Sequence, residues 1–186
     1  MSDRAYAQFV QRMMFEGPLP VRFEAATPAG GGQLRLLAER NARLLGAIEL
    51  LEERRAEHER DRLDDATAQE LARMDAKLNL LIEIVTHALA PAHGLPQRQR
   101  VRFNAVGAEV PDPLVPDDAR HGRLLLSFDA CLALPLELDC EVEDGAGAGQ
   151  RFLRFVHPGE TVVEALERFV FRHHRRQLAD VRHTGG

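Results

Sequence analysis

The alternation of hydrophobic and polar positions predicts a strand in the first stretch of the chain, residues 1–32. Leu19, Val21 and Phe23 alternate with the charged Arg22 and Glu24, which is the period of two typical of a half-buried strand. A strand this short is not stable alone, so we expect it to pair with a segment further along the chain. The glycines at positions 30–32 that follow provide a flexible exit from it.

Residues 33–90 form a second stretch, which contains no proline and is rich in Leu, Ala, Glu and Arg. These residues favour helix, and we predict two helices, at about 33–63 and 68–89. The break lies around Asp64–Asp65, because Thr67 and Glu70 have the spacing of a capping box at a new helix start. Pro91 and Gly94 end the second helix.

The second predicted helix has the alternating spacing of three and four residues that marks a coiled-coil seam. The seam positions are Leu71, Met74, Leu78, Leu81 and Val85. Further apolar residues lie off the seam, so we expect burial on two sides, against the first helix and against a second subunit.

The first predicted helix repeats this spacing. Its apolar positions are Leu34, Leu37, Leu44, Ile48 and Leu51, and Asn41 lies within the pattern. A polar residue on such a seam can set the register and the oligomeric state. The second half of this helix, residues 52–62, has no large apolar residue, and we expect it to be solvated.

A third stretch, residues 95–157, contains several short segments with strand character that are separated by turns rich in Pro, Asp and Gly. This pattern predicts a small antiparallel barrel or sandwich. Its segments are residues 100–103, 107–110, 123–128, 134–142 and 150–156. A closing helix follows at a second capping box, Thr161 and Glu164, with Val162, Leu166, Phe169 and Val170 facing inward.

Composition limits the classes of function. The chain has 186 residues, 45% of them hydrophobic and 28% charged, with a net charge of −5, which suits one globular core with an appendage. A net negative charge does not attract nucleic acid or an anionic membrane to the chain as a whole. The basic run from Arg168 to Arg176 is interrupted by apolar residues, so it does not favour nucleic-acid binding either. There is no apolar run of signal-peptide or membrane-spanning length, so we expect a cytoplasmic protein with Cys131 and Cys140 as buried free thiols.

Motifs for metal binding and catalysis are missing from the sequence. The eight histidines have no spacing that favours a metal site, and no nucleophile or nucleotide-binding motif is present. Asp139, Glu141 and Glu143 share one face of a strand, which we expect to be solvated. We therefore predict no catalytic residue, no metal and no cofactor.

The order of elements resembles a PilZ domain. The resemblance rests on the strand Leu19-Pro-Val-Arg-Phe23, the segment Asn104-Ala-Val-Gly-Ala-Glu-Val110 and the closing helix from Glu164 to Leu178. It implies an α+β fold, in which a small antiparallel β-barrel has a long helical hairpin inserted after its first strand and a C-terminal helix. The barrel domain then comprises residues 1–32 and 91–186. The insertion, residues 33–90, resembles that of the atypical branch of the family, in which helices with heptad repeats assemble four chains, and so implies a homo-tetramer.

PilZ domains are, as a family, receptors for cyclic di-GMP, and this sequence departs from both of their usual binding motifs. An Arg-x-x-x-Arg segment is expected ahead of the first strand, but Arg12 is followed four residues later by Glu16. In the family's Asp/Asn-x-Ser-x-x-Gly turn, Gly107 would take the glycine position, so Asn104 replaces the serine and Arg102 the acidic residue.

Three interpretations stay open. In the first, the dinucleotide site is degenerate, and the chain is a non-enzymatic oligomeric adaptor for an unknown protein partner. In the second, cyclic di-GMP binds at a non-standard site formed by Arg98, Arg102, Asn104 and Gly107, because guanidinium groups match phosphate oxygens and the edge of guanine. In the third, the chain is a structural scaffold without a nucleotide.

Overall fold

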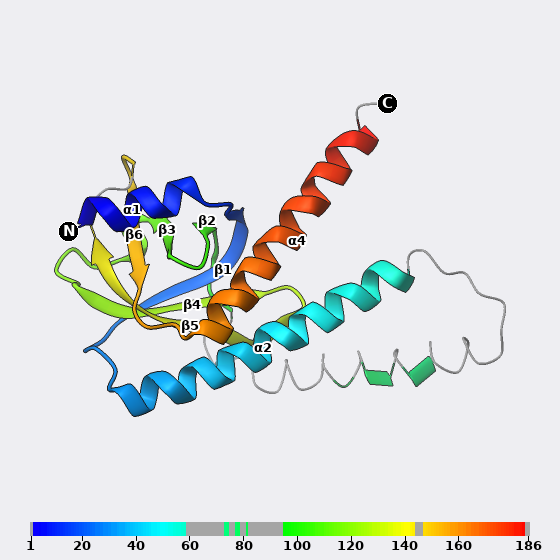
Figure 1. Ribbon diagram of the computed structural model, residues 1–186, viewed down its shortest axis with the longest axis horizontal. Coiled ribbons are helices and arrows are strands. Elements are labelled where there is room, and N and C mark those ends of the chain that lie inside the picture. Colours follow the sequence, from blue (N-terminus) through cyan, green and yellow to red (C-terminus); the bar gives the residue numbers. More distant parts are fainter. Residues whose placement is uncertain are drawn as a thin grey trace.

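Six antiparallel strands close into a barrel in the order β1-β2-β3-β6-β5-β4 (Figure 1). The computed structural model describes residues 2–58, 73–74, 77–78, 81, 95–143 and 147–184. The strands are β1 (Phe15–Ala25), β2 (Arg98–Phe103), β3 (Gly107–Pro111), β4 (His121–Phe128), β5 (Cys131–Glu143) and β6 (Gln150–Phe155). The α+β barrel predicted from the sequence is confirmed.

The first strand has the predicted pattern, with Leu19, Val21 and Phe23 buried and Arg22 and Glu24 exposed. Its partners are β2, which pairs with residues 15–20, and β4, which pairs with residues 21–25. One strand therefore joins two parts of the sheet that are distant in sequence. The other strands also agree with the sequence pattern, with ends that differ by up to three residues.

The described helices are α1 (Ser2–Gln11), α2 (Gly31–His58) and α4 (Glu160–Thr184), and a short 3₁₀ helix spans Asp112–Leu114. The sequence pattern did not predict α1. Two predicted boundaries were also wrong: Gly31 and Gly32 belong to α2, and α4 begins one residue before Thr161. Residues 73–74, 77–78 and 81 are helical, as predicted, whereas the proposed break near residue 64, Leu71 and Val85 lie outside the described residues.

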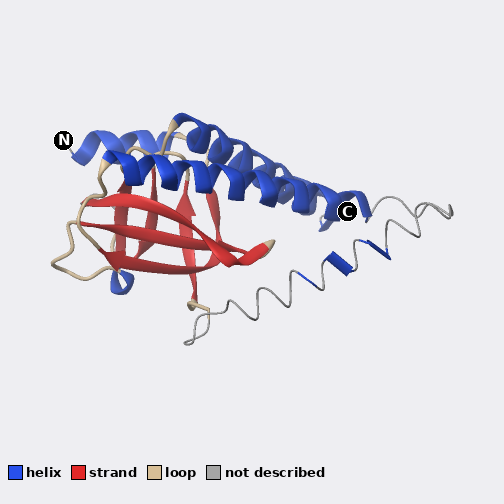
Figure 2. Ribbon diagram, turned by 90° about the horizontal axis from the view of Figure 1, so that it is seen from below, coloured by secondary structure: helices blue, strands red, loops and turns tan. Residues whose placement is uncertain are grey.

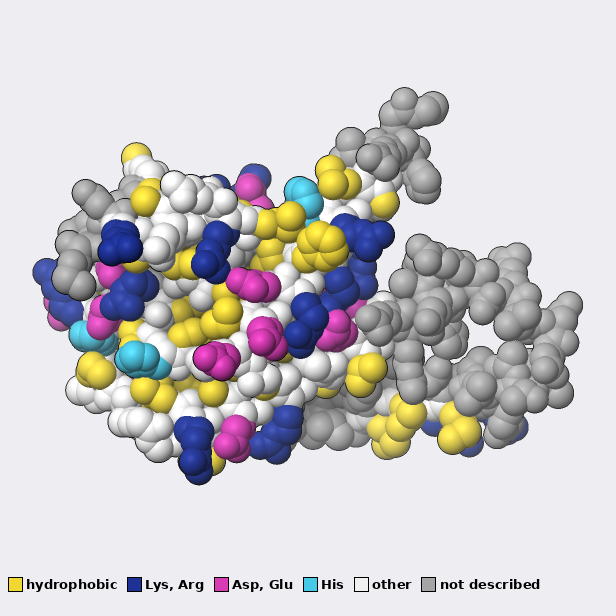
Figure 3. Space-filling view, in the orientation of Figure 1, with side chains coloured by type: hydrophobic (Ala, Val, Ile, Leu, Met, Phe, Trp, Pro, Cys, Tyr) yellow, Lys and Arg dark blue, Asp and Glu magenta, His cyan; other side chains and the backbone are white. Residues whose placement is uncertain are grey.

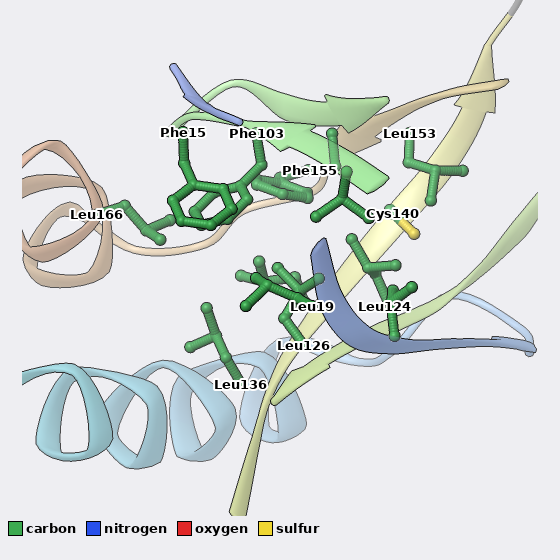
Figure 4. Packing of buried hydrophobic residues seen from close by; sticks show 14 of the residues in the cluster. Phe15, Leu19, Phe103, Leu124, Leu126, Leu136, Cys140, Leu153, Phe155 and Leu166 are labelled. Atoms are coloured by element: carbon green, nitrogen blue, oxygen red, sulfur yellow. The ribbon is translucent and has the colours of Figure 1, made fainter. Parts of the chain in front are cut away.

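The apolar face of α4 packs into the barrel core. Val162, Leu166, Phe169 and Val170 are at most 3% exposed, as the spacing predicted. Phe169 lies 6.0 Å from the ring of Phe103 and 4.8 Å from the ring of Phe128. Figure 4 shows Leu166 beside the Phe15 and Phe103 rings, with Leu19, Leu126 and Leu136 of the strands below them. His173 continues this aromatic stack, and burial lowers its pKa.

The helix α2 packs against β5 and α4 of its own chain (Figure 2). Leu44, Leu45 and Ile48 are buried in the same hydrophobic cluster as the barrel residues. The sequence placed Asn41 on a seam between helices, but its side chain instead lies against β5. Asn41 Nδ2 donates to the carbonyl oxygen of Glu137 (2.6 Å), and the Glu137 N–H donates to Asn41 Oδ1 (3.3 Å).

Ion pairs join α2 to α4 beyond this apolar contact. Arg172 binds Glu49, and Arg176 Nη1 lies 3.0 Å from Glu52 Oε2. Acidic and basic side chains gather beside these two helices in Figure 3. Glu52 was expected to be solvated, but its side chain is only 21% exposed because it faces α4.

The acidic face of β5 is also covered, in contrast to the solvated face that we expected. The carboxylate of Asp139, a residue that is 7% exposed, accepts a hydrogen bond from the Ala29 N–H. Glu141 and Glu143 both pair with Arg154 of the neighbouring strand. Partners from other segments therefore bind the carboxylates of a face that looks solvated in the sequence.

Replacing Asn41 by leucine should destabilise the fold. The substitution leaves the N–H and the carbonyl of Glu137 without their side-chain partner. A buried unsatisfied group costs about 1–3 kcal/mol, and because these two are only partly buried we expect the lower part of the combined range, a fall of about 2–4 kcal/mol in the free energy of unfolding measured by urea titration. Gln33→Ala removes an exposed amide from the same helix and should leave stability unchanged. Equal stability of Asn41→Leu and the wild type would show that this contact contributes nothing.

Candidate ligand-binding site

Three of the four candidate ligand residues meet where β2 turns into β3. Arg102 pairs in register with Glu109, and the Asn104 N–H donates to the carbonyl oxygen of Gly107 (3.0 Å). Asn104 Oδ1 accepts a hydrogen bond from the Val106 N–H (2.9 Å), which is the side-chain contact of an Asx turn. We name Arg102, Asn104, Gly107 and Glu109 the β2–β3 corner.

The fourth candidate, Arg98, lies at the opposite end of β2. It binds Asp129 and donates to the carbonyl oxygen of Pro18 (3.3 Å). Four residues of extended strand separate Arg98 from Arg102, which is about 13 Å. The structure therefore does not bring Arg98 to the β2–β3 corner.

The remaining arginines of β2 are paired with carboxylates. Arg100 Nη2 lies 2.5 Å from Glu16 Oε1, and Arg102 Nη1 lies 2.5 Å from Glu109 Oε2. The carboxylate of Glu109 is only 3% exposed, so its pairing with Arg102 is largely shielded from water. Glu16 lies beside both of these arginines, with Arg102 Nε 3.8 Å from its Oε2. A bound anion would compete with both carboxylates, and opening the Arg102–Glu109 pair would leave a buried charge unpaired.

The N-terminal helix α1 lies over this corner, across β6 and β3 in Figure 1. The Tyr6 hydroxyl donates to Glu109 Oε1 (2.7 Å), and Asn104 Nδ2 donates to the carbonyl oxygen of Phe9 (3.0 Å). The rings of Tyr6 and Phe9 pack on Phe152 at 5.3 and 5.1 Å. The hydrogen bond to Glu109 and burial raise the pKa of Tyr6, so its hydroxyl remains a donor at neutral pH.

Sequence reasoning missed both Tyr6 and Glu109 as parts of this site. Tyr6 and Phe9 are three residues apart and so share one helical face, which was the available signal for α1. No comparable signal existed for Glu109, because its partner Tyr6 is 103 residues away in the sequence.

Gly107 has a packing role that is independent of any ligand. A Cβ atom at this position would lie 2.5 Å from the carbonyl oxygen of Leu153 and 2.7 Å from the ring of Phe152. Both contacts are far shorter than van der Waals distance, and one of them is with backbone. The close approach of β3 to β6 therefore requires glycine here.

Outside the β2–β3 corner, the described residues offer few groups for metal binding or catalysis. No group of three His, Cys, Asp or Glu side chains there could hold a metal ion. Both cysteines are free thiols. Cys140 is buried, and this burial raises the pKa of its thiol to about 12. Cys131 is only partly buried, against our expectation. A shallow depression around His157, Gly159 and Glu164 shares no residue with the corner.

Comparison with known proteins identifies the family. Residues 44–183 match the family model described as "Atypical PilZ domain, cyclic di-GMP receptor". The chain belongs to the atypical PilZ domain family. This PilZ chain is also similar to the crystal structure of a pathogenic protein from Xanthomonas campestris, with 25% sequence identity and a TM-score of 0.71. The similarity covers 96% of this chain and 97% of the other, which is described as a tetrameric PilZ domain self-assembled via an unusual helical bundle.

No match was found among curated proteins. None of the helices within the described residues combines the length and the apolar run that crossing a membrane requires.

Gly107→Ala should destabilise the barrel even when no ligand is present. The added methyl group meets Leu153 and Phe152, so β3 and β6 must move apart. Overpacking of this kind costs about 1–3 kcal/mol, which thermal or urea unfolding of the ligand-free protein would measure. Gly147→Ala, with no atom within 4 Å of the added carbon, is the matched control. A stable Gly107→Ala protein would contradict the packing role of this glycine.

Proposed function

We propose that this PilZ chain is a non-enzymatic, oligomeric adaptor in cyclic di-GMP signalling whose dinucleotide motifs are degenerate. The observation that supports this most directly is the pairing of the β2–β3 corner with the chain's own groups. Arg102 is bound by Glu109, and Asn104 by the backbone of α1. A site whose arginine and amide already have partners offers little to a ligand, so the role left for the chain is assembly and contact with a protein partner.

The proposed assembly uses residues 33–90 as an inserted helical hairpin on a barrel domain of residues 1–32 and 91–186. Three of the five proposed seam residues, Met74, Leu78 and Leu81, are described, and they are 53%, 49% and 56% exposed in the single chain. Large apolar side chains at heptad spacing favour burial between chains. Because the similar Xanthomonas protein is a tetramer assembled via a helical bundle, we propose a homo-tetramer here.

A second candidate function is a receptor that binds cyclic di-GMP through Arg98, Arg102, Asn104 and Gly107. The gathering of the last three in one corner favours it. Arg98 is the weak member, because it lies at the far end of β2 and pairs with Asp129. A structural scaffold without nucleotide is the third candidate, and it predicts no response to the dinucleotide at all.

The cellular setting that we propose is the cytoplasm. The two free thiols suit a reducing compartment. Nucleic acid is not a proposed partner, because two arginines of the basic run in α4 already bind carboxylates of the chain: Arg172 pairs with Glu49 and Arg176 with Glu52. We propose no catalytic residue and no metal.

Isothermal titration with cyclic di-GMP tests the adaptor proposal. We expect no saturable binding by the wild-type protein at micromolar ligand, because the anion would have to displace Glu109 from Arg102. Micromolar binding that Arg102→Ala abolishes would refute the degenerate site and favour the receptor. Arg22→Ala, which removes an exposed arginine from a neighbouring strand, controls for nonspecific loss of charge.

Light scattering tests the proposed seam. Replacing Leu78 and Leu81 together by glutamate should dissociate the tetramer, because charges would be buried between chains. The barrel should stay folded, as circular dichroism would show. Leu134→Glu alters a similarly exposed leucine on β5 and should not change the mass. If the double variant remains a tetramer, the interface lies elsewhere, and a monomeric wild type would refute the oligomer itself.

A further inference from the structure

The contact between α1 and the barrel depends on few residues. Among residues 4–11, whose burial is described, only Phe9 is buried, and Ala5 and Tyr6 are partly buried. Arg12, just after the helix, adds an exposed ion pair with Glu167 of α4 at 3.1 Å. A ten-residue helix has little stability of its own in water, so α1 is helical because it is docked. Its attachment can therefore be lost without unfolding the barrel.

The surface beneath α1 combines groups that suit a purine nucleotide. The Phe152 ring is fully buried under Tyr6 and Phe9, and Gly107 beside it has no side chain. Without α1, that ring would offer an aromatic face for a base to stack on. Asn104 Nδ2 would lose its acceptor, the Phe9 carbonyl, and become free to donate to a phosphate or guanine oxygen.

Charge at the corner also depends on α1. Glu109 accepts hydrogen bonds from both Tyr6 and Arg102. The Arg102 Nε is buried without a hydrogen-bond partner, although Glu16 lies 3.8 Å away. When Tyr6 leaves, water can reach Glu109, and the guanidinium can turn toward an anion at lower cost.

We propose that α1 is an autoinhibitory cap, and that cyclic di-GMP reaches Arg102, Asn104, Gly107 and the Phe152 ring only when α1 leaves the barrel. This deepens the receptor candidate of the proposed function, on which it rests, because the docked α1 explains why the same corner is closed in the free chain. If α1 is released in about 1% of molecules, the apparent dissociation constant is about a hundredfold weaker than that of the open site. The closed chain would then behave as an adaptor, and a partner that removes α1 would turn it into a receptor.

Full-chain variants of Tyr6 test the cap. Tyr6→Ala removes the hydrogen bond to Glu109 and the ring on Phe152, and Tyr6→Phe removes only the hydrogen bond. Hydrogen exchange of residues 2–11 reports the release of α1, and titration with cyclic di-GMP reports the affinity. We expect faster exchange together with at least about tenfold tighter binding for Tyr6→Ala, and a smaller gain for Tyr6→Phe. Gln8→Ala, an exposed position on α1, should match the wild type.

Two outcomes would overturn the proposal. In one, α1 is released and cyclic di-GMP binds no more tightly than to the wild type. In the other, exchange stays at the wild-type rate in both Tyr6→Ala and the double variant Tyr6→Ala with Arg12→Ala, so that α1 is a fixed part of the fold. Light scattering on the same samples distinguishes failure of the cap from failure of the oligomeric adaptor. If the cap is disproved and the samples are still tetramers, the adaptor proposal is unaffected.

Discussion

The outer edge of β5 is the constraint on which the arrangement of the helices depends. This strand has 13 residues, but only Cys140–Glu143 pair with β6. The backbone groups of Glu137 therefore need partners from outside the sheet, since buried peptide groups are almost always hydrogen-bonded. Asn41 provides a donor and an acceptor together and takes the place of a neighbouring strand. That amide holds α2 on the barrel together with the buried Leu44, Leu45 and Ile48, and Glu49 then lies against α4. The start of the inserted segment is thus set by a contact within one chain.

At the β2–β3 corner, polar side chains also form hydrogen bonds and ion pairs within the chain, but the consequence is different. The polar side chains there bind groups of the chain itself: Arg102 Nη1 binds Glu109, Glu109 binds Tyr6, and Asn104 binds the backbone of Phe9, whereas Arg102 Nε has no hydrogen-bond partner. Asn41 holds a long helix that is also anchored by ion pairs. The shorter α1 is held by the hydrogen bonds of Tyr6 and Asn104, by the buried Phe9 ring and by one exposed ion pair of Arg12. The two helices therefore differ in how easily they can leave. Under the proposed cap, a closed adaptor and an open receptor are two states of one PilZ chain, separated by the docking of the ten residues of α1.

The spacing of hydrophobic residues predicted those strands and helices whose buried positions repeat regularly along the sequence. The alternation of Leu19, Val21 and Phe23 identified β1, and the spacing of Leu166 and Phe169 identified the buried face of α4. Arg102, Asn104 and Gly107 lie at one turn, and their role as a ligand site stays a prediction. What failed depends on partners distant in sequence: the pairing of Asn41 with Glu137, the neutralised acids of β5, and α1, which has too few buried positions to produce a clear period. Arg98 was grouped with the corner because it is near in sequence, although the rise of a strand carries it to the other end.

Gly107 has a consequence for how such sequences are classified. The glycine meets the packing demand of Phe152 and Leu153, and it would be needed whether or not a nucleotide ever binds. Selection on folding alone would then preserve it after the arginines of a binding motif had changed. In this PilZ chain the turn glycine therefore reports on barrel geometry, and the side chains around it are the better guide to whether a second messenger is recognised.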